Sequence, residues 1–240
     1  MKHWTTSSGY TIFRVLRFRS NAFLVTNGRN NLLVDSGTKR YRRQLLWSLA
    51  KLGVSHLDAL ILTHSHFDHA GNAHYIQNRF HTPVLIHSDE AGYLQNGQTP
   101  VPGGTMLLTR FLIRNFGNKV GSLMKFEPCE ANQTFKTRLD LSKFGFKGYI
   151  LPTPGHSQGS VSIVIDDDIV LAGDALFGVF PASVMPPYAQ DKGLMIQSWK
   201  ILLDTGAGSF FPAHGKPLTI KAIESCYNKN IRNITLNSQS

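Results

Sequence analysis

The segment THSHFDH at residues 63–69 contains four side chains that can bind metal ions, namely His64, His66, Asp68 and His69. It follows the apolar run ALIL, which predicts a buried strand. Side chains alternate between two faces in an extended segment, so His64 and His66 point the same way. If a helix begins near Phe67, Asp68 and His69 project from its first turn, where the positive helix end suits a carboxylate. The segment therefore predicts one ion at the first two histidines and a second beside Asp68 and His69.

Three further residues of the same kinds each follow an apolar segment. His156 lies in LPTPGHSQGS, Asp174 in VLAGDALF and His214 in FFPAHGKP. An α/β scaffold gathers its functional groups at strand ends, so these residues can converge with residues 63–69. Imidazole and carboxylate suit zinc, and they also suit iron or manganese. The sequence therefore predicts two divalent metal ions, with zinc favoured and iron or manganese as alternatives.

The remaining chain alternates apolar runs typical of strands with segments typical of helices. Strands are expected at residues 11–18, 22–26, 31–34, 57–62, 83–87, 148–151, 161–165, 169–172 and 209–211, and helices at 40–52, 71–79, 196–203 and 216–227. Strands with flanking helices in both halves predict an α/β fold. With 240 residues, of which 42% are hydrophobic, the chain suffices for a single domain spanning residues 1–240.

Residues 88–134 have a looser pattern and are expected to form a lid or insertion in that domain. Within them, residues 105–116 are mostly apolar, while Arg110 and Arg114 share one edge of a helical wheel. This stretch is too short to span a bilayer. Three interpretations remain open: a helix in the core or at a subunit contact, a lid over the active site, or a surface that faces lipid.

The order and spacing of the seven residues closely resemble the pattern of the metallo-β-lactamase-fold hydrolase superfamily, H-x-H-x-D-H followed by single His, Asp and His ligands. The resemblance covers residues 21–216 and implies a four-layer αββα sandwich with the metals at one edge of two sheets. It implies that His64, His66 and His156 bind one ion. It further implies that Asp68, His69 and His214 bind a second ion, and that Asp174 bridges the two.

Two ions at such a site can share a water and convert it to the attacking hydroxide. Asp68 is the expected catalytic residue, because it can orient this hydroxide and carry its proton. The phrases TPGHSQGS and GDALF look most like the glyoxalase II, thioesterase and lactonase branch, which implies hydrolysis of a thioester, lactone or ester. A phosphodiesterase or nuclease of the same fold and a non-catalytic metal-dependent binding protein are the alternatives.

Two other residues have expected roles near this site. Asp35 ends the run NLLVD and resembles a recurrent aspartate of the family, so it can accept hydrogen bonds from the His-rich segment, with a turn or helix cap as the alternative. Tyr188 follows the loop FGVFPASVMPP, which can line an apolar acyl pocket. Its hydroxyl is a candidate donor to the substrate, with ordinary loop packing as the alternative.

The overall charge favours anionic partners, because 25 Lys and Arg residues outnumber 15 Asp and Glu residues. The basic residues are scattered, which favours a small anionic substrate over nucleic acid. No apolar run approaches the roughly 20 residues of a membrane span, and the first residues lack a signal-peptide pattern, so a cytoplasmic protein is expected. Cys129 and Cys226 predict no disulfide framework. The oligomeric state is left open.

Overall fold

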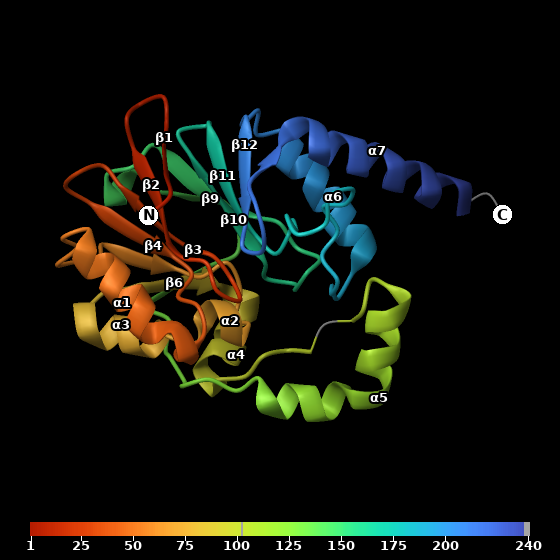
Figure 1. Ribbon diagram of the computed structural model, residues 1–240, viewed down its shortest axis with the longest axis horizontal. Helices are drawn as coiled ribbons and strands as arrows, with labels where there is room; N and C mark the ends of the chain where they lie inside the picture. The colour runs from red at the N-terminus through yellow and green to blue at the C-terminus, as the bar shows by residue number, and fades with distance from the viewer. Residues whose placement is uncertain (102, 238–240) are drawn as a thin grey trace.

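The computed structural model contains two β-sheets that face each other, with helices on their outer sides (Figure 1). It describes residues 1–101 and 103–237. Within these residues the first sheet has seven strands, in the order β1 (His3–Thr5), β2 (Thr11–Leu16), β3 (Ala22–Thr26), β4 (Asn31–Val34), β5 (Ala59–Ile61), β6 (Val84–His87) and β7 (Gln133–Phe135). Strands β1 to β4 pair antiparallel and β4 to β7 pair parallel.

The second sheet is built from the C-terminal half of the chain. Its order is β13 (Leu218–Thr219), β12 (Ser209–Pro212), β11 (Ile169–Gly173), β10 (Val161–Ile165), β9 (Gly148–Pro152) and β8 (Leu139–Asp140). Only β11 and β12 pair parallel among these described strands. Every residue of β10 and β11 is buried, because the sheet is covered on both faces.

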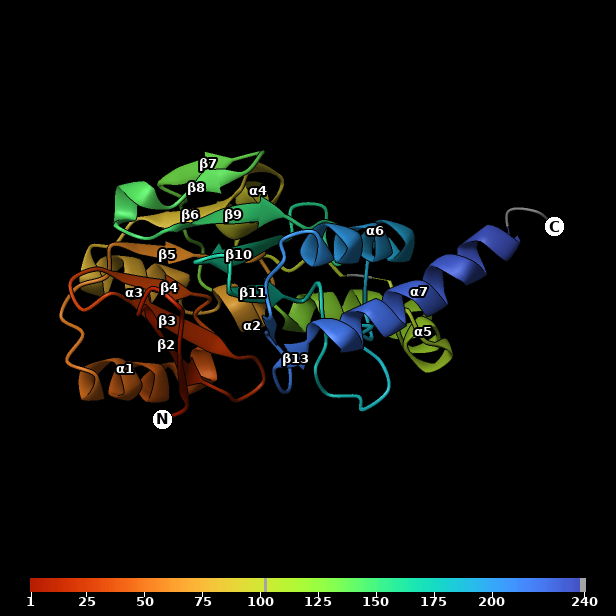
Figure 2. The ribbon, with the colours of Figure 1, turned by 90° about the horizontal axis from the view of Figure 1, so that it is seen from above.

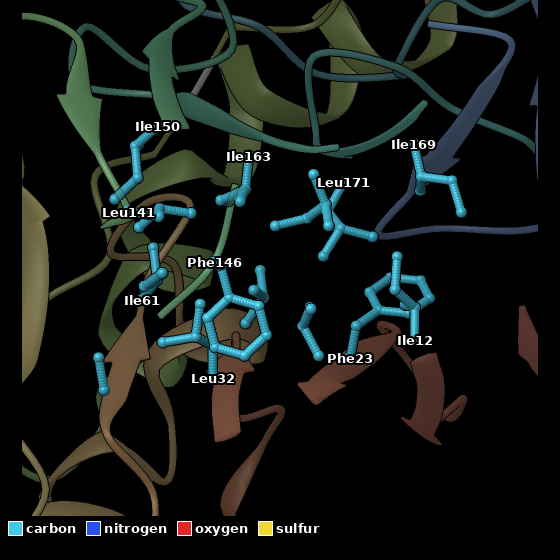
Figure 3. Packing of buried hydrophobic residues seen from close by; sticks show 14 of the residues in the cluster. Ile12, Phe23, Leu32, Ile61, Leu141, Phe146, Ile150, Ile163, Ile169 and Leu171 are labelled. Carbon is cyan, nitrogen blue, oxygen red and sulfur yellow. The ribbon is translucent and has the colours of Figure 1, made fainter. Parts of the chain in front are cut away.

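Three apolar clusters hold the layers together. In the central one, Phe23 and Leu32 of the first sheet face Ile163 and Leu171 of the second, as Figure 3 shows. A second cluster joins the first sheet to α1 (Arg42–Lys51), α3 (Ala73–Phe80) and α4 (Ser88–Asn96). A third joins the second sheet to α6 (Lys192–Leu203) and α7 (Ile220–Asn237), which lie on its outer side (Figure 2). The predicted four-layer αββα sandwich is confirmed.

Several expected boundaries are wrong. The helix expected to begin near Phe67 and continue over residues 71–79 is two helices, α2 (Phe67–Ala70) and α3. The helix expected at 216–227 begins only at Ile220, after β13. The sequence also missed β1, β7 and β8, which are edge strands of two or three residues, and the short 3₁₀ helices Lys39–Tyr41 and Ser142–Phe144. Elements this short contain too few residues for a hydrophobic period.

The segment that stands outside the four layers is shorter than the expected 88–134. Leu94 of α4 and Cys129 belong to the apolar cluster behind the first sheet, and β7 pairs with β6. Helix α5 (Leu107–Leu123) lies beyond the layers (Figure 1). Its residues Leu107 and Phe111 are 86% and 61% exposed, so the interpretation of residues 105–116 as a core helix is wrong.

The two sheets meet at the edge where the predicted ligands lie. The amide of Val161, at the start of β10, donates to the carbonyl of Thr63, just after β5, at 2.9 Å. Gly173 at the end of β11 packs against the same threonine. A Cβ at Gly173 would lie 2.8 Å from the Thr63 Cβ, and the φ of 53° also favours glycine. This close approach joins the ends of strands from both sheets.

Candidate metal centre

The seven predicted metal ligands come together at this shared edge. His64 and His66 follow β5, Asp68 and His69 lie on α2, and the other three follow β9, β11 and β12. The ligand atoms form three groups, each within 4.8 Å: His64, His66 and His156; His64, His69 and Asp174; and Asp68, His69 and His214. The first and third groups are the two sets that the sequence resemblance implied. All seven side chains are buried except that of His214, which is partly buried.

Asp174 lies between the two sets of side chains. Its Oδ2 is 3.4 Å from Nε2 of His156, while its Oδ1 is 3.3 Å from Nε2 of His214 and 3.6 Å from Nε2 of His69. One carboxylate oxygen therefore faces each set. In this position the carboxylate would be able to contact a cation held by either set.

Several atoms of the cluster are buried without a hydrogen-bond partner among the described residues. They include Nε2 of His64, Nε2 of His69 and Oδ1 of Asp174. Buried polar atoms are almost always paired, so this concentration of unpaired atoms indicates a missing partner. Nδ1 of His66 and Nε2 of His156 also face each other at 3.1 Å, close to the roughly 3.3 Å between two nitrogens on one tetrahedral zinc. The cluster fits divalent cations.

Hydrogen bonds on the far side of three imidazole rings fix their orientation. Nδ1 of His69 contacts Oδ2 of Asp35 at 2.8 Å, and Nδ1 of His156 donates to the main-chain carbonyl of Tyr188 at 2.9 Å. Nδ1 of His64 contacts the Thr63 hydroxyl at 3.1 Å. Each contact leaves the opposite ring nitrogen, Nε2, facing the cluster. Such outer contacts set the tautomer and basicity of metal-binding histidines.

Asp35 holds the His-rich segment, as the sequence predicted. Strands β4 and β5 run parallel, so the residues after their carboxyl ends are neighbours, and Asp35 lies beside Thr63. Its Oδ1 accepts from the Thr63 amide at 2.8 Å while its Oδ2 accepts from the Thr63 hydroxyl at 2.9 Å. Asp35 has a φ of 60°, in the left-handed region, and these contacts offset that backbone strain.

Three histidines of the cluster are held neutral. Burial lowers the pKa of His64, His66 and His156 below the ordinary histidine value, and neighbouring histidines lower the pKa of His64 and His66 further. A neutral imidazole can bind a cation without first losing a proton. This set of three is therefore ready to receive an ion at neutral pH.

Carboxylates raise the pKa of the other two histidines of the cluster, His69 and His214. Burial alone would lower the pKa of His69, but the carboxylates of Asp35 and Asp174 outweigh it and raise this pKa to about 10. Asp174 likewise outweighs burial at His214 and raises its pKa. Burial would raise the pKa of Asp174, but the neighbouring histidines lower it well below its usual value. The anionic carboxylate attracts positive charge, which a bound cation supplies when it displaces these protons.

The comparison with known families agrees with this geometry. Residues 15–214 match the model of the Metallo-beta-lactamase superfamily. The chain belongs to this superfamily. It is 29% identical over 160 residues to the probable metallo-hydrolase MJ0888 of Methanocaldococcus jannaschii, covering 67% of this chain and 68% of that protein. It is also 29% identical over 214 residues to the probable metallo-hydrolase M6_Spy0554 of Streptococcus pyogenes serotype M6, covering 88% and 83%.

Solved structures of the superfamily share the fold. The metallo-beta-lactamase family protein TTHA1429 from Thermus thermophilus superposes with a TM-score of 0.68 at 20% identity, covering 93% of this chain and 79% of that one. The crystal structure of TTHA1623 in a di-iron-bound form superposes with a TM-score of 0.62 at 25% identity, covering 88% and 95%. The chain is thus a superfamily metallo-hydrolase with a His and Asp cluster suited to divalent ions.

Glu90 is a supporting residue that the seven-residue superfamily pattern does not include. It is buried on α4, where one carboxylate oxygen accepts from the amide and hydroxyl of Ser65, and the other accepts from the amide of Gly159 at 3.2 Å. Gly159 leaves room for this contact, because a Cβ there would lie 2.6 Å from Cγ of Glu90. Glu90 therefore ties the segment with His64 and His66 to the segment with His156. Nothing in the local sequence distinguishes it from a surface glutamate.

Arg19 is a second residue that the sequence analysis did not assign to the site. It has a φ of 65°, and its Nε lies 3.5 Å from Oδ2 of Asp68. Its guanidinium lies over the ring of Phe67, 5.1 Å from the centroid. The neighbouring Ser20 hydroxyl donates to the main-chain carbonyl of Asp68. The turn between β2 and β3 therefore contacts the segment that carries Asp68.

A cavity of about 480 Å³ opens onto the cluster. Asp68, His66, His156, Asp174 and His214 form its polar floor. The walls are mostly apolar and come from several segments of the chain. They are Val101, Leu112, Ile113, Phe116 and Met124 on or near α5, Phe177, Pro186, Pro187 and Tyr188 after β11, and Arg19, Phe67 and Thr99 from three other segments. The predicted apolar pocket after Asp174 is thus part of this cavity, and Tyr188 lines it.

Replacing Glu90 tests whether the ligand segments depend on this buried carboxylate. Glu90→Ala leaves the Ser65 and Gly159 amides buried without their acceptor, so we expect the free energy of unfolding to fall by about 2–4 kcal/mol in urea titrations. The exposed Glu224→Ala on α7 is the matched control and should change it by less than about 0.5 kcal/mol. Equal effects of the two changes would show that Glu90 does not hold the segments together.

Proposed function

We propose that the protein is a binuclear metal-dependent hydrolase that cleaves an acyl-type bond, a thioester, lactone or ester, in a small molecule. The observation that carries the proposal is that seven ligand-type side chains form one cluster, several with unpaired buried atoms among the described residues, and that five of them form the floor of a largely apolar cavity. The relatives named as probable metallo-hydrolases support the hydrolytic reaction. The apolar walls support an acyl substrate.

The proposed ligand sets follow the two groups of side chains. His64, His66 and His156 hold one ion, and Asp68, His69 and His214 hold the other. Asp174 contributes one oxygen to each set. Zinc is the favoured metal, and iron is the first alternative because the similar TTHA1623 has a di-iron-bound form. When bound, the two ions lower the pKa of a shared water and polarise the substrate carbonyl.

Asp68 is the proposed catalytic residue of this chain. Its Oδ2 lies 3.7 Å from Nε2 of His214 and 3.5 Å from Nε of Arg19, and it lines the cavity. A carboxylate in this place accepts a proton from the attacking water and delivers it to the leaving group. Tyr188 is a proposed hydrogen-bond donor to the substrate oxygen, since it lines the cavity beside His156.

Arg19 gives the cavity a preference for substrates with a negative group. It is the single Lys or Arg side chain among the described residues that line the cavity, and 53% of it is exposed. A planar guanidinium can bind a carboxylate or phosphate through two hydrogen bonds. We therefore expect a substrate with an apolar acyl portion and an anionic group, which agrees with the net charge of +10.

A panel of substrates tests the proposed reaction. Zinc-loaded and chelator-treated protein would be offered a glutathione thioester, an acyl-homoserine lactone, an aryl ester, a β-lactam and a phosphodiester. We expect metal-dependent turnover of the thioester, the lactone or the aryl ester, measured as acid release. Turnover of the phosphodiester alone would contradict the proposal and show that the protein is a phosphodiesterase of the same fold. The net positive charge is the observation that favours this alternative.

Asp68→Ala tests the assigned catalytic role. With metal content verified, we expect kcat for the best ester of the panel to fall by at least about 100-fold, because proton transfer by a positioned side chain contributes roughly that factor or more. KM should change little. Asp204→Ala, which removes an exposed carboxylate just after α6, is the control and should leave both constants unchanged. Full activity of Asp68→Ala would remove Asp68 from the mechanism.

Arg19→Ala tests the preference for anionic substrates. Aryl esters of matched length, with and without a carboxylate on the acyl chain, would be compared. We expect the carboxylate ester to lose about fivefold in kcat/KM through a higher KM, since a half-exposed ion pair contributes about 1 kcal/mol. The neutral ester should be unaffected, and Arg19→Lys should retain most of the preference. An equal loss for both esters would mean that Arg19 acts by positioning Asp68 instead.

A further inference from the structure

Helix α5 has apolar side chains on both of its faces. Residues three or four positions apart share a face of a helix, and Ile113 and Phe116 line the cavity on the same face as Thr109. The Thr109 hydroxyl anchors this face by donating to the carbonyl of Pro187 at 2.9 Å. On the opposite face, Leu107 and Phe111 are 86% and 61% exposed. Contact with the cavity therefore explains why the inner face of α5 is apolar, but it does not explain the apolar side chains of the outer face.

The outer face forms a concentrated apolar patch. Leu108 lies next to Leu107 and Phe111 and is 69% exposed, so three large apolar side chains are neighbours along one side of the helix. Both figures of the whole chain show α5 outside the layers of the sandwich (Figures 1 and 2). A patch of this kind on a globular domain usually marks a surface that contacts another apolar partner.

The charges around the patch indicate what the partner is. Arg110 and Arg114 are exposed along its edge, and the sequence of α5 contains no Asp or Glu. The partner must therefore offer both an apolar interior and negative charge. A helix with Leu and Phe on one side and flanking basic residues has this chemistry when it lies in the interface of a membrane with anionic head groups.

A second copy of the chain fits this patch less well. A symmetric dimer would bring the same surface of each subunit together, so the arginines of one α5 would face those of the other without a carboxylate from either helix. No helix among the described residues is long and apolar enough to cross a bilayer. A lipid surface with anionic head groups offers α5 both an apolar interior and negative charge.

We propose that α5 docks on an anionic lipid surface, with Leu107, Leu108 and Phe111 inserted at the boundary between head groups and acyl chains. Arg110 and Arg114 then contact the lipid phosphates. This binding requires neither a metal ion nor hydrolysis, so it stands or falls independently of the proposed reaction.

Vesicle co-sedimentation with the whole chain tests the docking. We expect binding to phosphatidylcholine vesicles that contain phosphatidylglycerol, at least about tenfold stronger than to phosphatidylcholine alone and weakened by salt. The double change Leu107→Ser with Phe111→Ser should lower this binding by at least about tenfold, because it removes the inserted side chains. Both side chains are exposed and outside the cavity lining, so the melting temperature should not change.

Two further variants keep the test specific. Trp47→Ser removes an apolar side chain that is 60% exposed on α1, far along the chain from α5, and should bind vesicles like the unaltered protein. Arg114→Glu should weaken binding to the anionic vesicles only. The proposal is overturned if the unaltered protein does not bind anionic vesicles, or if the double change leaves binding intact. It is also overturned if sedimentation velocity shows that the patch forms a dimer instead.

Discussion

The main energetic constraint on this fold is that seven ligand-type side chains, six of them buried, gather at the edge shared by the two sheets. Burying imidazole and carboxylate groups costs free energy unless each finds a partner. Asp35, Thr63 and the carbonyl of Tyr188 pair the outer nitrogens of three rings, and Asp174 takes the opposing charge of His69 and His214. Several inner atoms of the cluster still lack partners among the described residues. Bound cations would supply these partners, and metal binding would then stabilise the fold.

Much of this arrangement follows from patterns that are local in the sequence. The four segments that carry the ligands each come shortly after an apolar run, and these runs become buried strands whose ends share one edge. Asp35 was predictable because it ends an apolar run and resembles a recurrent aspartate of the family, and the parallel pairing of β4 with β5 places it beside Thr63. Glu90 and Arg19 were not predictable. Their roles arise from contacts with residues 25 to 69 positions away for Glu90 and 49 positions away for Arg19, which no local period records.

Helix α5 shows a different limit of sequence patterns. An ordinary surface helix has one apolar face, and that face identifies the side that packs on the core. In α5 the cavity side and the solvent side are both apolar, so the pattern cannot orient the helix, and core or subunit-contact, lid and lipid-facing interpretations stayed open. The exposure of Leu107 and Phe111 excludes the core interpretation. The second apolar face is itself informative. It has no protein partner among the described residues, and a helix that lies on a lipid surface needs such a free apolar face.

The floor and the walls of the cavity come from different parts of the chain. Its floor comes from strand ends and α2, which the two sheets and Glu90 hold in place. Its walls come from α5, the loop after β11 and the turn that carries Arg19, all of which lie outside the strands. A relative can therefore keep the four layers and the hydrolytic metal centre while its walls accept another substrate. We expect changes at Phe116 or Arg19, which line the walls, to alter what the cavity admits, and changes at Asp35 or Glu90 to act on the metal centre.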